Sequence, residues 1–294
     1  MRYLAGFIGL GNMGMPMAAN MLRKFGSFIV YNRSRGKSEL LAQEGAAIAD
    51  DLGAMAEATD LIFLCLPGPK QVAEIVPQLL AHGKPGLLIV DFSTIAPADS
   101  QRMYAMAVER GMNYIDIPVS GGGAGAAKGA LSLMIGATEA EIAELNLMPW
   151  LETIANKFYY MDNRGSGSAI KIINNYMAFT AQVINGEALL MADRLGISVD
   201  KFYDVATHSS GNNMILGAKM NKVRQGDLTP GFATDLVLKD LELARQLCQG
   251  GSIPNFTLNT GIQFYRMAQL LGHGKDDSSS VIQVIREVNA PKAE

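Results

Sequence analysis

The first 160 residues alternate short apolar runs with amphipathic stretches. Apolar runs bounded by glycine or polar residues are typical of strands that are buried on both faces of a sheet. The stretches between them repeat apolar residues with a helical period, as in 13–25, 69–81 and 97–110. This alternation predicts a doubly wound parallel sheet. Its predicted strands are 3–9, 27–31, 61–66, 87–92 and 114–118, and two further strands are predicted at 130–136 and 157–161.

After residue 165 the strand pattern gives way to long helical periods divided by glycine and proline. The chain is therefore predicted to consist of an α/β domain, residues 1–164, followed by an all-α domain, residues 165–294. The first helix of the second domain would span ~45 Å if it has ~30 residues, which is long enough to link two domains. The predicted helices are 166–195, 199–208, 212–225, 233–248, 256–271 and 278–288.

Composition and charge argue against several classes of protein. The 294 residues are 49% hydrophobic, enough for two cores, and a net charge of −3 offers no basic surface to nucleic acid or an anionic membrane. The longest apolar region, 170–192, carries Lys171, Glu187 and several amides, so it is not a membrane span. Two distant cysteines form no disulfide framework, and the N-terminus lacks the pattern of a signal peptide. We expect a cytoplasmic protein.

A glycine-rich turn follows the first predicted strand and opens the first predicted helix. The pattern G-x-G-x-x-G in this context is typical of dinucleotide-binding domains, in which the turn and the helix N-terminus receive a pyrophosphate. An ordinary strand-to-helix turn is the alternative. The candidate cofactor-binding residues of the turn are Gly9, Leu10, Gly11, Asn12, Met13 and Gly14.

The end of the second predicted strand indicates which dinucleotide is bound. NAD-binding domains usually place an acidic residue here, against the ribose hydroxyls. This chain has Asn32, Arg33 and Ser34 instead. Because arginine offers a charge-assisted fork to a phosphate, these residues favour NADP over NAD, which remains possible. Alternatively, Arg33 is a solvated loop residue.

The segment 165–175, "GSGSAIKIINN", places a lysine and two amides in the first turns of an apolar helix. Lys171 and Asn175 are four residues apart and share one helix face, and Asn174 is close enough to support Lys171. An ammonium beside a carbonyl can protonate the oxygen as charge develops on it, and a neutral amine can take a proton from an alcohol. The alternative is a lysine whose charge reaches solvent.

A second glycine run, "SGGGAG" at 120–125, follows a predicted strand. Successive backbone N–H groups and a hydroxyl at such a turn form a nest that binds an anion, and a carboxylate is the expected one here. A flexible linker is the alternative.

Four blocks resemble the β-hydroxyacid dehydrogenase family, which includes 3-hydroxyisobutyrate dehydrogenases and tartronate semialdehyde reductases. They occur in the order and at the spacing of that family, and the resemblance covers essentially the whole chain. The blocks are "GFIGLGNMGMPMAANML" (6–22), "DIPVSGGGAGAAKGALSLMIG" (116–136), "GSGSAIKIINN" (165–175) and "GFATDLVLKDLELA" (231–244).

The resemblance implies a Rossmann domain that binds NAD(P) and a helical second domain. It makes Lys171 the catalytic residue and assigns the substrate to Ser120, Gly121, Gly122, Asn175 and Phe232. The implied supporting residues are Asn174 and Asp240. Further implied cofactor contacts are Leu66, Pro67, Thr94 and Lys239. The chain departs from the family beside this loop at Gly68, where an asparagine is common.

Together these features predict hydride transfer between NADP(H), with NAD(H) weaker, and a small 3-hydroxy acid or its semialdehyde. The partners expected are a small carboxylate-bearing substrate and further copies of the chain, as a dimer or tetramer, with no nucleic acid or membrane. No metal is expected, because the three histidines lack ligand spacing. The alternatives are a non-catalytic NADPH-binding module and an imine reductase, although imine reductases usually lack the lysine. A 6-phosphogluconate dehydrogenase would need a larger second domain.

Overall fold

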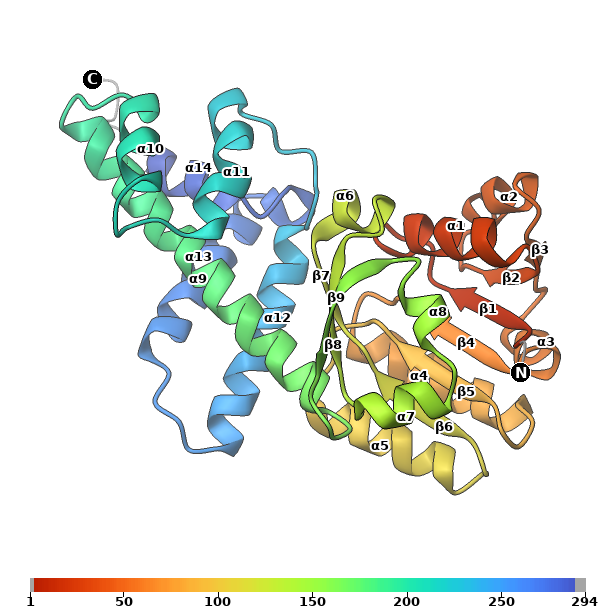
Figure 1. Cartoon of the computed structure of the whole chain (residues 1–294). Coiled ribbons are helices and arrows are strands. Elements are labelled where there is room, and N and C mark those ends of the chain that lie inside the picture. Colours follow the sequence, from red (N-terminus) through yellow and green to blue (C-terminus); the bar gives the residue numbers. More distant parts are fainter. Residues whose placement is uncertain (1–2, 289–294) are drawn as a thin grey trace. The chain divides into compact units, whose positions relative to one another are not determined.

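The computed structural model describes residues 3–288 and divides into two compact units, with the division between Lys171 and Ile172. Figure 1 colours the first unit from red to green and the second from green to blue. The sequence prediction placed a domain boundary slightly earlier, between residues 164 and 165. Helix α9 (Ser166–Arg194) runs through the division, so its first residues count with the first unit.

The first unit is built on a six-stranded sheet with the strand order β3-β2-β1-β4-β5-β6. Every pair of neighbouring strands in it is parallel, which confirms the doubly wound sheet. The central strands are buried on both faces, as their unbroken apolar sequences predict. The strands are β1 (Ala5–Ile8), β2 (Phe28–Tyr31), β3 (Ala47–Ile48), β4 (Leu61–Leu64), β5 (Leu88–Asp91) and β6 (Asn113–Asp116).

Helices cover this sheet (Figure 1) and create two separate apolar clusters. Side chains alternate between the clusters along each strand, so that Phe7 and Phe63 belong to one and Ile8 and Ile62 to the other. Trp150 closes the first cluster with its ring 5.7 Å from that of Phe63. The helices are α1 (Gly14–Phe25), α2 (Arg35–Gln43), α3 (Leu52–Ala58), α4 (Pro69–His82) and α5 (Pro97–Val108).

The two further predicted strands belong to a separate three-stranded sheet, with the order β7-β8-β9. Strands β8 (Leu131–Ile135) and β9 (Ala155–Tyr160) run parallel, and β7 (Val119–Ser120) is antiparallel to β8. The sequence did not predict β3, β7 or the short helices of the first unit, because such short elements contain too few residues to display a period. Three of these helices are α6 (Gly122–Ala127), α7 (Glu139–Glu144) and α8 (Met148–Leu151).

The second unit is helical throughout its described residues, as predicted, apart from loops and a single isolated β-bridge. Side chains of Ser198 and Asn213 accept hydrogen bonds at the N-termini of α10 and α11, which accounts for the places where these helices begin. No helix in residues 3–288 is long and apolar enough to cross a membrane. The helices after α9 are α10 (Val199–Thr207), α11 (Met214–Gln225), α12 (Thr234–Gly250), α13 (Phe256–Leu270) and α14 (Ser280–Val288), with a 3₁₀ turn η1 (His273–Lys275) before α14.

Candidate active site

The glycine-rich turn has the geometry that its sequence predicts. Gly9 has a φ of 98°, which favours glycine, and its N–H donates to the Tyr31 carbonyl at 3.1 Å. A side chain at Gly14 would collide with the Gly9 carbonyl, so helix α1 can approach β1 closely only with glycine there. A side chain at Gly11 would meet only open space. The backbone at Gly11 is thus accessible to a ligand beside a helix N-terminus, which fits a dinucleotide pyrophosphate.

Asn32 links this turn to the end of β2. Its Oδ1 accepts from the Leu10 N–H at 2.9 Å, and its Nδ2 donates to the carbonyl and the hydroxyl of Ser34, each at 3.0 Å. The sequence singled out Asn32 as a possible cofactor contact, and the structure shows it as a brace between two loops. Arg33 and Ser34 are exposed, and Arg33 has no hydrogen-bond or ion-pair partner among the described residues.

A buried network fixes the loops after β4 and β5. The Leu66 N–H donates to Ser93 Oγ at 2.9 Å, and the Ser93 N–H donates to Asp91 Oδ1 at 2.8 Å. Asp91 Oδ2 accepts from the Tyr114 hydroxyl at 2.6 Å. Burial raises the pKa of both Asp91 and Tyr114, and hydrogen bonds from Ser93 and Tyr114 oppose the rise for Asp91. The expected cofactor residues Leu66, Pro67 and Thr94 adjoin this network.

The expected carboxylate nest is a turn between β7 and α6. Ser120 ends β7, and α6 begins at Gly122. A side chain at Gly123 would lie 3.2 Å from the Asn12 carbonyl, so this loop runs against the dinucleotide turn. The amide of Asn20, on α1, donates to the Ala126 carbonyl at 3.0 Å and fastens α6 to α1.

Lys171 lies in the second turn of α9 and is 8% exposed. Asn175 follows one turn later on the same helix and is also buried.

The sequence analysis missed the two residues that fix the beginning of this helix, Asp116 and Arg164. The buried Asp116 carboxylate accepts from the N–H groups of Gly165 and Ser168, each at 2.8 Å.

Arg164 immediately precedes Gly165, the first of these two donors. Its guanidinium donates to the carbonyls of Tyr114 and Gly136 at 2.7 and 2.8 Å and also pairs with Glu141. The only signals for these residues in the sequence were a polar residue that ends an apolar strand, in "YIDIP", and an arginine beside the glycine entry to the helix.

In the second unit a buried carboxylate gathers three of the expected residues. Asp240 is fully buried; its Oδ2 accepts from Asn175 Nδ2 at 2.6 Å and its Oδ1 lies 2.7 Å from Lys239 Nζ. Asn174 Nδ2 donates to Asn175 Oδ1 at 3.3 Å. The amide of Asn175 is thereby fixed in orientation, with its oxygen and one donor already assigned.

Both the ring and the backbone of Phe232 are held in place by neighbouring residues. The ring stacks on Phe179 with centroids 5.4 Å apart, and the N–H groups of Gly231 and Phe232 donate to Asp277 Oδ2 at 2.9 and 3.3 Å. Burial would raise the pKa of Asp277, but the Lys219 ammonium at 2.7 Å holds it below its ordinary value. The charged carboxylate therefore anchors the loop that carries Phe232.

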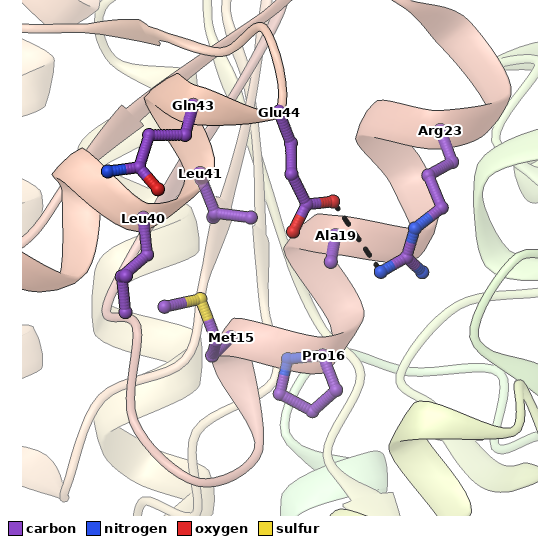
Figure 2. Close-up of a pocket in the computed structure, with 8 residues that line it drawn as sticks. All are labelled: Met15, Pro16, Ala19, Arg23, Leu40, Leu41, Gln43 and Glu44. Carbon is purple, nitrogen blue, oxygen red and sulfur yellow. Dashed lines mark ion pairs between the residues drawn. The ribbon is translucent and has the colours of Figure 1, made fainter.

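The described residues include no cluster of histidine, cysteine or acidic side chains that could hold a metal ion. A surface pocket of about 450 Å³ lies between α1 and α2 (Figure 2), beside an ion pair of Arg23 with Glu44 at 3.5 Å. None of the expected site residues lines it. Those in the first unit gather instead at the carboxyl ends of parallel strands, where open α/β sheets bind ligands. The pocket is lined by Met15, Pro16, Ala19, Arg23, Leu40, Leu41, Gln43 and Glu44.

Both units match known protein families. Residues 5–162 match the NAD binding domain of 6-phosphogluconate dehydrogenase. Residues 165–285 match a family described as the NAD-binding domain of NADP-dependent 3-hydroxyisobutyrate dehydrogenase.

Individual relatives extend the similarity over nearly the full length. The chain is 34% identical over 283 residues to 2-(hydroxymethyl)glutarate dehydrogenase of Eubacterium barkeri, covering 95% of this chain and 93% of that protein. It is 32% identical over 293 residues to L-threonate dehydrogenase of Escherichia coli K12, covering 98% and 96%. A solved structure of Mycobacterium tuberculosis 3-hydroxyisobutyrate dehydrogenase with L-serine superposes with a TM-score of 0.88 at 29% identity, covering 97% and 100% of the two chains.

The bridge made by Asn32 generates a prediction for the dinucleotide turn. Asn32→Ala should weaken NADPH binding about 5- to 30-fold, because it removes hydrogen bonds worth roughly 1–2 kcal/mol that fix the turn before the ligand arrives. Lys37→Ala, at an exposed position of α2, removes no bond of this bridge and should leave binding within about twofold of wild type. Titration of NADPH by fluorescence measures both, and equal affinities for Asn32→Ala and wild type would contradict the bracing role.

Proposed function

The chain belongs to the β-hydroxyacid dehydrogenase family, and we propose that it transfers a hydride between NADP(H) and a small 3-hydroxy acid or the corresponding semialdehyde. NAD(H) is the weaker cofactor in this proposal. The observation that carries it is the burial of Lys171 on α9, one helical turn before Asn175, whose amide is oriented by Asp240. A buried amine and a fixed amide on one helix suit proton transfer to an oriented hydroxyl.

The first unit supplies the cofactor contacts in this proposal. The turn from Gly9 to Gly14 receives the pyrophosphate, while Arg33 and Ser34 bind the 2′-phosphate. When bound, the nicotinamide ring supplies the chemistry of hydride acceptance and donation. The remaining cofactor contacts proposed are Leu66, Pro67, Thr94 and Lys239.

Lys171 carries the proton in either direction of the reaction. In oxidation, its neutral amine takes the hydroxyl proton while the carbon loses its hydride to the oxidised cofactor, and a carbonyl forms. In reduction, its ammonium returns a proton to the oxygen as the hydride arrives at the carbon. The acid or base therefore acts at the oxygen on which charge changes, where such a group accelerates a reaction most.

The proposed substrate carries a carboxylate, and the proposed site for it is the turn after β7. The Ser120 hydroxyl and the N–H groups of Gly121 and Gly122 are the proposed donors to it, as in other backbone anion nests. Asn175 and Phe232 contact the rest of the substrate, the first by hydrogen bonding and the second by apolar contact.

Removal of the amine tests the proposed chemistry. Lys171→Ala should lower kcat by roughly 10²–10⁴ with NADPH affinity little changed, the usual scale for a positioned acid-base group. Lys157→Ala is the matched control, because that lysine is exposed on β9. The assay follows nicotinamide absorbance with a panel of hydroxy acids and semialdehydes. A Lys171→Ala variant with a tenth or more of the wild-type rate would refute the role, and NADPH binding without turnover of any substrate by the wild type would indicate a binding module.

The preference for NADPH over NADH tests the proposed contact of Arg33 with the 2′-phosphate. A 2′-phosphate gains charge-assisted hydrogen bonds from this exposed guanidinium, each worth roughly 1.5–3 kcal/mol, so NADPH should exceed NADH in kcat/KM by about tenfold or more. Arg33→Asp should reverse the preference by repelling the phosphate, whereas Lys37→Asp on α2 should alter it little. Equal or NADH-favouring values for the wild type would show that Arg33 does not contact the cofactor.

We also propose that the chain forms a homo-oligomer through its helical region. Helix α9 and the residue after it expose an apolar stripe: Ile173, Met177, Ile184, Met191 and Leu195 are 47%, 67%, 54%, 61% and 77% exposed. Their spacings of four and seven residues keep them on one side of the helix. A contiguous apolar stripe of this kind is typical of a surface that packs against another chain.

The oligomer proposal predicts a mass of two or four chains by light scattering at micromolar concentration. A double variant, Met177→Glu with Ile184→Glu, should reduce that mass while leaving the circular dichroism spectrum unchanged, because it places charge in the apolar stripe. Leu40→Glu, on an exposed position of α2, is the control. A monomeric wild type would contradict the proposal.

A further inference from the structure

The beginning of α9 is held by a carboxylate from another element. Asp116, the last residue of β6, is 1% exposed. Its Oδ1 accepts from the Gly165 N–H and its Oδ2 from the Ser168 N–H, each at 2.8 Å. Ser168 is in the first turn of α9, where N–H groups have no acceptor within the helix. Each oxygen of the carboxylate therefore satisfies a donor that would otherwise remain buried without a partner.

The backbone packs closely around this contact. A side chain at Gly167 would collide with the Met134 carbonyl, and one at Gly136 would collide with the Asp116 carboxylate itself. Gly136 also donates its N–H to the Asp116 carbonyl at 2.8 Å. The helix N-terminus is thus pressed directly against the ends of β6 and β8.

Backbone N–H donors and a helix N-terminus face the Asp116 carboxylate. Asp116 forms no ion pair with any described residue, so its charge is balanced by the N–H donors and by the positive end of the α9 dipole. Arg164, the residue before Gly165, is itself fixed by its hydrogen bonds to the Tyr114 and Gly136 carbonyls.

We infer that Asp116 is a positioning residue for Lys171. Lys171 follows Ser168 by three residues, about 4.5 Å further along the helix axis, and both belong to the rigid early turns of α9. A carboxylate that fixes Ser168 therefore fixes the origin of the lysine side chain. The inference rests on the proposed acid-base function of Lys171. It adds that the Asp116 carboxylate determines the position of the Lys171 side chain. Displacements of about 1 Å at reacting groups cost on the order of 10²-fold in rate.

Asp116→Asn is the sharpest perturbation, because it keeps the shape and removes one acceptor. An amide presents one oxygen and one NH₂, so either the Gly165 or the Ser168 N–H would face a donor instead of an acceptor. We expect kcat to fall about 10²-fold, with KM and the Kd for NADPH each within about threefold of wild type. Trp150→Phe, which loosens the aromatic cluster without touching α9, is the matched control for lost stability and should leave kcat within about twofold.

Two measurements separate positioning from general damage. Backbone hydrogen exchange, read by NMR without cofactor or substrate, should show protected Gly165 and Ser168 amides in the wild type and at least one of them exchanging about tenfold faster in Asp116→Asn. In a Lys171→Ala background, Asp116→Asn should lower kcat by less than about threefold further, since the group that it positions is gone.

Each outcome has a distinct meaning. Unprotected Gly165 and Ser168 amides in the wild type would overturn the contact, even if Asp116→Asn failed to fold. The full loss from Asp116→Asn in the Lys171→Ala background would show that Asp116 acts elsewhere, and would leave the role of Lys171 intact. A Lys171→Ala variant that keeps its rate would instead remove the proposed function, and with it this role of Asp116.

Discussion

The rest of the candidate site depends on the contact between the Asp116 carboxylate and the first turn of α9. Neither partner is stable alone when buried: a carboxylate needs donors, and first-turn N–H groups need acceptors. Each supplies what the other lacks, with both hydrogen bonds at 2.8 Å. The helix that carries Lys171 is consequently attached to the end of β6, a strand at the edge of the parallel sheet, rather than to a loop. Sites built on such rigid elements hold their geometry more closely than sites on loops.

Buried aspartate carboxylates fix neighbouring polar groups in both units. Asp91 and Asp116 are paired in the register of β5 with β6. Asp91 accepts from an N–H of the loop that follows β5, and Asp116 accepts from N–H groups at the beginning of α9. In the second unit, Asp240 fixes the Asn175 amide and the Lys239 ammonium. Asp277 fixes the backbone of the Phe232 loop. Buried carboxylates are costly unless their oxygens are satisfied, so the hydrogen bonds and ion pairs of these four explain how an otherwise apolar interior orients polar groups.

The sequence alone predicted the parallel sheet, the helical second unit and most helices to within a few residues, because long apolar periods report burial directly. It also made the glycine turn and Lys171 candidate site residues, and the family resemblance added Lys239 and Asp240 to them. It did not reveal Asp116 or Arg164, since their partners lie about 50 residues away along the chain and leave no local period. It named Asn32 as a candidate cofactor contact, but it gave no sign that both ends of the Asn32 amide join two loops. Contacts of this kind depend on which strand ends adjoin, which is a property of the tertiary structure.

The most direct test of the account is a crystal structure of the protein with NADP⁺ and a small 3-hydroxy acid. The decisive quantity is the distance from Lys171 Nζ to the hydroxyl oxygen of the substrate. The account predicts a hydrogen bond of about 2.6–3.2 Å, with the substrate carboxylate at the N–H groups of Gly121 and Gly122. A substrate hydroxyl bound to another titratable group, with Lys171 directed away from it, would contradict the account.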